Sequence, residues 1–148
     1  MRQIFNVIVA ALLAILLGAC SRPVLPVPAP NDPLIGHWYG EDFQPVFQGS
    51  AKWLMHRTQD GKFTIQFTTS EGGKVLPIQT EEGQWTHKNG RYTTRTLKVN
   101  GNPMSTTDPQ YLDEYEVQAI SSTEMTYRHL KMNITFQSLK VGSEFQVP

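Results

Sequence analysis

The side chains that could bind a metal ion are spread thinly along this sequence. The four histidines are His37, His56, His87 and His129. Histidine is the commonest metal ligand, but each of these falls in a different predicted strand, and none has the His-x-x-x-His spacing of a helical zinc site. Strand alternation places His87 and His129 on faces that carry large apolar residues, so these two could share an interior. With no third ligand in view, we expect no metal site and no cofactor.

Groups for nucleophilic or acid–base catalysis are equally sparse. Glu114 and Glu116 lie two residues apart and therefore on one face of a strand, where a carboxylate pair could serve as general acid and base. A solvated outer face explains them as well. The chain lacks a Gly-x-Ser-x-Gly nucleophile motif. The stretch 71–74 (EGGK) lacks the following helix that would let a glycine-rich loop bind phosphate. We therefore predict that the protein is not an enzyme.

Cys20 is the single cysteine, and it follows a segment typical of export signals. Arg2 supplies a positive charge, residues 4–17 are almost wholly apolar, and Gly18 and Ala19 are small. About 14 apolar residues make a helix of roughly 21 Å, shorter than the hydrocarbon core of about 30 Å. The segment therefore indicates a cleaved signal rather than a membrane span. A lone cysteine has no intramolecular disulfide partner, so this thiol calls for another role.

The sequence Leu17-Gly18-Ala19-Cys20 resembles the lipobox of bacterial lipoproteins. The resemblance implies diacylglycerol transfer to the Cys20 thiol, cleavage between Ala19 and Cys20, and N-acylation, for example by palmitate. Two or three acyl chains suffice for stable membrane anchoring. Ser21 after the cysteine, rather than Asp, points to the periplasmic face of the outer membrane. The alternative is an ordinary secretory signal followed by an incidental cysteine.

These features divide the chain into a signal peptide (1–19), a lipidated proline-rich tether (20–33) and one domain (34–148). The tether holds five of the ten prolines, which favours an extended, semi-rigid spacer; a proline-rich ligand for a partner's groove is the alternative. Without Arg2, twelve Lys and Arg face thirteen Asp and Glu, a formal charge of −1. This balance argues against a nucleic-acid partner.

The domain has the period-two pattern of an all-β fold. The expected strands are 35–40, 51–58, 62–69, 84–88, 91–99, 110–120, 124–130 and 133–141. Pro77 makes 74–82 an edge or irregular segment. Asp60-Gly61 and Asn89-Gly90 predict hairpins with primed turns. About eight antiparallel strands joined by short links predict a meander, closed as a barrel or folded as a sandwich.

Gly36-His37-Trp38 resembles the Gly-x-Trp motif in the first strand of lipocalins. The stretches 82–85 (EGQW), 89–90 (NG) and 125–127 (MTY) are similar to small lipocalin-like domains of bacterial lipoproteins. The resemblance implies a small barrel with Trp38 packed across its closed end.

Aromatic side chains offer the best candidate binding site. Trp38, Trp53, Trp85 and Tyr127 fall on different strands and could line a cavity for a small apolar ligand; the alternative is that they fill the core. We expect a membrane-anchored module that binds such a ligand or an envelope protein. The alternative function is a structural or assembly accessory that docks without a ligand, through an apolar loop containing Phe43, Pro45, Val46 and Phe47.

Overall fold

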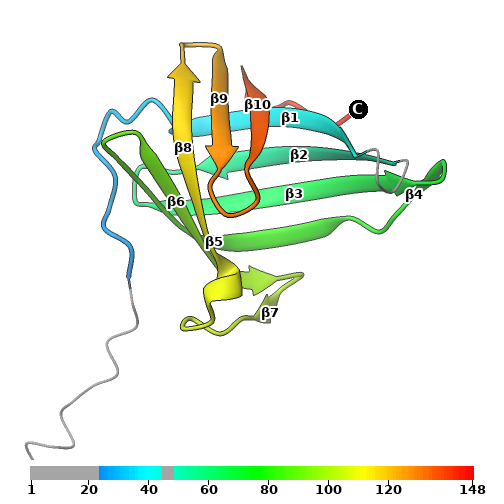
Figure 1. Ribbon diagram of the computed structural model, residues 1–148, viewed down its shortest axis with the longest axis horizontal. Helices are drawn as coiled ribbons and strands as arrows, with labels where there is room; N and C mark the ends of the chain where they lie inside the picture. The colour runs from blue at the N-terminus through cyan, green and yellow to red at the C-terminus, as the bar shows by residue number, and fades with distance from the viewer. Residues whose placement is uncertain (1–23, 45–48) are drawn as a thin grey trace, which may run out of the picture.

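The computed structural model describes residues 24–44 and 49–148, which form a closed antiparallel β-barrel (Figure 1). Its eight strands are β1 (Gly36–Gln44), β2 (Gly49–Arg57), β3 (Lys62–Glu71), β5 (Gln79–Lys88), β6 (Arg91–Val99), β8 (Leu112–Ile120), β9 (Glu124–His129) and β10 (Ile134–Val141). Three short elements lie in the connections: β4 (Lys74–Val75), β7 (Asn102–Pro103) and the 3₁₀ helix η2 (Pro109–Tyr111).

Each barrel strand pairs with the next one along the chain, and β1 pairs with β10 to close the ring. The closing register joins His37 to Val141 and Trp38 to Lys140. Closure leaves no unpaired sheet edge in the barrel. The predicted meander and barrel are thereby confirmed, and the sandwich alternative is excluded.

Gly83 explains one difference from the predicted strands. The segments 74–82 and 84–88 were expected to be separate, but residues 79–88 form one strand with a bulge between Glu82 and Gly83. A Cβ on Gly83 would lie 2.0 Å from the Arg95 carbonyl oxygen. The glycine therefore permits a close approach of two strands rather than ending a strand.

The two predicted primed turns have different outcomes. Asn89 and Gly90 both have positive φ, 54° and 75°, as a type I′ turn requires. At Asp60-Gly61 only Gly61 has positive φ, 77°, so the prediction of a primed turn at this position is wrong. The chain instead reverses over residues 58–61, where the Gly61 N–H donates to the Thr58 carbonyl at 3.1 Å.

The core lies inside the barrel, where alternate residues of each strand point inward. Its buried apolar members are Leu34, Trp38, Trp53, Met55, Phe63, Ile65, Trp85, Tyr92, Met125 and Tyr127. Trp38 is fully buried near the start of β1, and its indole N–H donates to the Leu34 carbonyl at 3.0 Å. Trp85 is fully buried too, and its indole N–H donates to the Thr58 carbonyl at 3.1 Å. These contacts pack the end of the barrel at which the chain enters β1.

The described part of the expected tether lies against this same end. The Leu25 N–H donates to the Gln84 side chain at 3.4 Å, and the Asp32 carboxylate pairs with His87 at 2.9 Å. Figure 1 shows residues 24–33 passing alongside the β5–β6 hairpin. The signal peptide and Cys20 lie outside the described residues.

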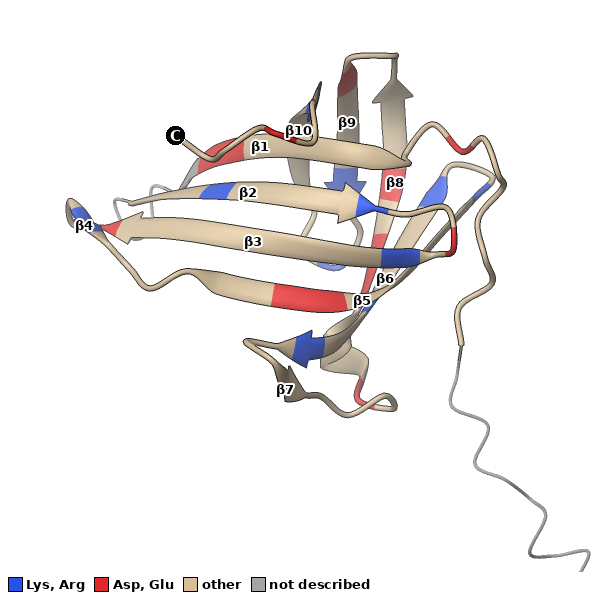
Figure 2. Cartoon of the chain, turned by 180° about the vertical axis from the view of Figure 1, so that it is seen from behind, with Lys and Arg blue, Asp and Glu red and all other residues tan. Residues whose placement is uncertain are grey.

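Charged residues are interspersed over the strands. Figure 2 shows both positive (blue) and negative (red) residues scattered over the strands of the barrel. This distribution matches the near-zero net charge of the sequence.

Replacing Gly83 by Ala should destabilise the barrel by about 3 kcal/mol, because its Cβ would meet backbone atoms that cannot move aside. Gly72→Ala is the control: Gly72 has positive φ but open space around it, so about 1 kcal/mol is expected. Urea denaturation of both variants measures the difference. Equal losses of unfolding free energy in the two variants would show that the close contact at Gly83 does not exclude a larger side chain.

Candidate functional site

A cavity of about 90 Å³ lies inside the barrel. It is lined by Trp53, Met55, Arg57, Ile65, Phe67, Tyr92, Tyr115, Tyr127 and Phe136. The aromatic members contact one another: the Tyr92 and Tyr115 rings stack with centroids 5.1 Å apart, and Trp53 meets Phe136 edge-on at 5.6 Å. An apolar cavity with a single charged group has the composition of a site for a small organic molecule.

Arg57 is the charged group of this cavity and is only 1% exposed. Its Nε–H donates to the Tyr92 hydroxyl at 3.0 Å, and the guanidinium carbon lies 4.5 Å from the centre of the Tyr92 ring. Its Nη1 is buried without a hydrogen-bond partner. Among the described residues, no carboxylate forms a salt bridge with Arg57. A buried and incompletely satisfied cation is costly, which marks this position for a function.

The tyrosines around Arg57 do not neutralise it. Burial raises the pKa of Tyr92 to about 12, although the adjacent Arg57 acts in the opposite direction. Burial also raises the pKa of Tyr115 well above its ordinary value, and it raises the pKa of Tyr127. The phenols therefore remain protonated at neutral pH and contribute polar hydroxyl groups, not charge.

The structure divides the four predicted cavity residues into two pairs. Trp53 and Tyr127 line the cavity. Trp38 and Trp85 are fully buried elsewhere in the core, at the end of the barrel where the chain enters. Arg57 was missed as a candidate, although strand alternation carried a signal. It follows Trp53 and Met55 in period two, so a cation falls on an apolar, inward face.

The four histidines do not form one site, because only His37 and His56 contact each other, whereas His87 and His129 pair with separate carboxylates. His87 pairs with Asp32 at 2.9 Å, and His129 Nε2 lies 3.0 Å from Asp113. Because His129 Nδ1 accepts the Met132 N–H, the Nε2 atom carries the proton and donates it to Asp113. Over residues 24–44 and 49–148, no group of three or more metal-ligating side chains is found.

Glu114 and Glu116 are exposed on β8, and Glu116 forms an ion pair with Arg128 at 2.9 Å. Their position matches the solvated outer face that the sequence suggested. Among the described residues, no side-chain hydrogen bond or ion pair joins either glutamate to a histidine or to another carboxylate.

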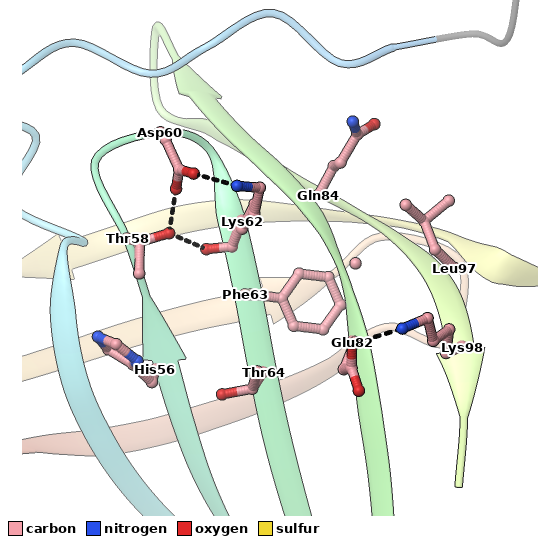
Figure 3. Close-up of a pocket in the computed structure, with 11 residues that line it drawn as sticks. His56, Thr58, Asp60, Lys62, Phe63, Thr64, Glu82, Gln84, Leu97 and Lys98 are labelled. Atoms are coloured by element: carbon pink, nitrogen blue, oxygen red, sulfur yellow. Dashed lines mark hydrogen bonds and ion pairs between the residues drawn. The ribbon is translucent and has the colours of Figure 1, made fainter. Parts of the chain in front are cut away.

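A second hollow, of about 500 Å³, lies between β2, β3, β5 and β6 (Figure 3). Its charged side chains pair with each other: Lys62 with Asp60, and Lys98 with Glu82 at 3.2 Å. Hydrogen bonds from Lys62 and Thr58 lower the pKa of Asp60 to about 2. Because these charges are already paired and exposed, the hollow is a weaker candidate than the barrel interior.

His56 and His37 provide a test of pH dependence on the outer surface. Their rings stack with centroids 4.0 Å apart, and desolvation followed by repulsion from His37 lowers the pKa of His56 below 6.5. As the pH decreases, His56 is protonated more readily in the unfolded chain than in the folded protein. The contribution of neutral His56 to the free energy of unfolding is therefore fully present above about pH 6.5 and is lost as the pH falls below it. Urea denaturation at pH 7.5 and 5.0 should show a smaller acid loss in His56→Gln than in the wild type. A control variant, Thr64→Gln on the neighbouring strand, should keep the wild-type loss. Equal losses in all three proteins would contradict this role of His56.

Comparison of the chain with protein-family models and with curated proteins found no match. Within the described part of the chain, no helix is long and apolar enough to cross a membrane.

Proposed function

We propose that this protein is a lipid-anchored module of the bacterial cell envelope whose barrel binds one small, largely apolar ligand. The observation that carries the proposal is the aromatic cavity around Arg57. Its lining is apolar over most of its surface and polar at a few positions, as in ligand sites that combine affinity with orientation.

The cavity limits the size of the ligand. A volume of about 90 Å³ exceeds the roughly 10–15 Å³ that one water needs by the same measure, but it is too small for a whole lipid. A short-chain molecule fits, as does one end of a longer chain. The core packing thus leaves room for a compact group while most aromatic residues still stabilise the fold.

The direction of entry follows from the packing of the two barrel ends. Leu34, Trp38 and Trp85 are fully buried at the end where the chain enters β1. The connections 72–78, 100–111 and 130–133 lie at the opposite end, because antiparallel strands alternate in direction. We expect the ligand to enter between these connections.

The membrane anchor is the second part of the proposal. It is supported by the lipobox-like Leu17-Gly18-Ala19-Cys20 and by the absence of any other cysteine. Acylation of Cys20 would hold the barrel at the membrane, most simply at the periplasmic face of the outer membrane.

An alternative function is docking to an envelope protein without a ligand. One described segment favours it: Val75, Leu76 and Ile78, in the connection between β3 and β5, are 73%, 40% and 55% exposed. The apolar loop suggested by the sequence, with Phe43, Pro45, Val46 and Phe47, lies outside the described side chains. A barrel that binds no small apolar molecule but is crosslinked through residues 75–78 would favour this alternative.

Ile65→Phe should block ligand binding, because the larger side chain enters the cavity that Ile65 lines. NMR titration with 1-hexanol as the probe should give an affinity at least about tenfold weaker than the wild type. Thr64→Phe adds the same ring at the adjacent, exposed position and should bind like the wild type. Wild-type protein that binds no 1-hexanol, or unchanged binding in Ile65→Phe, would overturn the ligand function.

Cys20→Ser should move the protein from the membrane fraction to the soluble fraction, because serine offers no thiol for diacylglycerol. Cell fractionation and immunoblotting measure the distribution, and Ser21→Ala is a control that keeps the thiol. Continued membrane attachment of Cys20→Ser would rule out lipidation as the anchor.

A further inference from the structure

We infer that the ligand of the barrel carries a carboxylate, which pairs with the Arg57 guanidinium inside the cavity. This inference rests on the proposed ligand-binding function and specifies the chemical class of the ligand. It makes the ligand a small amphiphilic monocarboxylate, with the acid group innermost and an apolar chain directed to the open end.

The first argument is charge. A guanidinium stays protonated in proteins, so Arg57 cannot escape the cost of burial by losing its proton. No carboxylate among the described residues forms an ion pair with it. Asp113, whose charge acts on Tyr92 and Tyr115, is bonded to His129 at 3.0 Å. A bound anion would supply the missing counter-charge.

The second argument is hydrogen bonding. Tyr92 accepts the Nε–H of Arg57 at 3.0 Å, and the guanidinium carbon lies over the Tyr92 ring, 4.5 Å from its centre. These two contacts restrain the group and leave Nη1 without a partner. Carboxylates form short, charge-assisted hydrogen bonds with such a donor. The restrained side chain then loses little further freedom on binding.

The third argument is size and surroundings. The cavity of about 90 Å³ accepts a carboxylate with a few carbon atoms but not a bulky phosphate ester. Beyond Arg57 the lining is mainly apolar, including Met55, Ile65, Phe67 and Phe136. These side chains suit an alkyl or aryl chain and offer nothing to a second charge. A monoanion with an apolar chain is therefore favoured over a dicarboxylate or an inorganic ion.

The test compares probes of equal chain length by NMR titration at pH 7: hexanoate, 1-hexanol and hexylamine. Wild-type protein should bind hexanoate at least about tenfold more tightly than 1-hexanol, and hexylamine most weakly. Arg57→Leu should abolish the preference for hexanoate while still binding 1-hexanol. Arg95→Leu is the matched control. Arg95 is also buried, donates to the Thr106 carbonyl and has an unpartnered Nε, but it does not line the cavity, so the preference should persist.

A variant-free measurement protects the test against misfolding of Arg57→Leu. The carboxyl signal of [1-¹³C]hexanoate in the wild-type complex should titrate at a lower pH than that of the free acid, because pairing with Arg57 favours the ionised form. Equal wild-type affinities for hexanoate and 1-hexanol, an unshifted titration, or a preference that survives in folded Arg57→Leu would each overturn the inference and leave the binding function intact. Failure of all three probes to bind would overturn both.

Discussion

The pairing of β1 with β10 is the interaction on which the rest of this structure depends. It joins the first and last strands of the meander and turns an open sheet into a barrel. Without closure, the inward faces would be open to water, and Arg57 would be an ordinary solvated side chain. With closure, a guanidinium is held in a small space surrounded by aromatic rings. The low dielectric of that space strengthens each electrostatic interaction inside it.

The two ends of the closed barrel differ in how they are packed. At one end Trp38, Trp85 and Leu34 are fully buried, and residues 24–33 lie against the same region through Leu25 and Asp32. Indole N–H groups there donate to backbone carbonyls, so the polar atoms of these large side chains are satisfied. The cavity lies between this packed end and the connections opposite. For the ligand function that we propose, this arrangement favours entry from the end opposite the packed one, with Arg57 orienting the ligand.

Much of the fold could be predicted from local patterns, because alternation, Asn-Gly turns and short links report on neighbouring strands. The alternation of Phe63, Ile65 and Phe67 predicted β3, and Asn89-Gly90 predicted the hairpin between β5 and β6. Gly83 misled the strand assignment, since its role is a contact with Arg95 on another strand. A single sequence carries no direct signal that the backbones of Gly83 and Arg95 approach each other closely. The candidate site was harder for the same reason: Trp53 and Tyr127 were found by residue type, whereas the Arg57–Tyr92 contact joins residues 35 positions apart. The pairs Asp32–His87 and Asp113–His129 are likewise products of the tertiary fold.

The most direct test of the central claim is native mass spectrometry of the protein released from membranes in mild detergent. We expect one small, noncovalently bound molecule per chain, which collisional activation releases as a monocarboxylate with an apolar chain. The chain itself should begin at Cys20 and carry the mass of its acyl groups. A ligand-free barrel, or a released molecule that is cationic or neutral, would show that Arg57 does not bind a carboxylate ligand in this cavity.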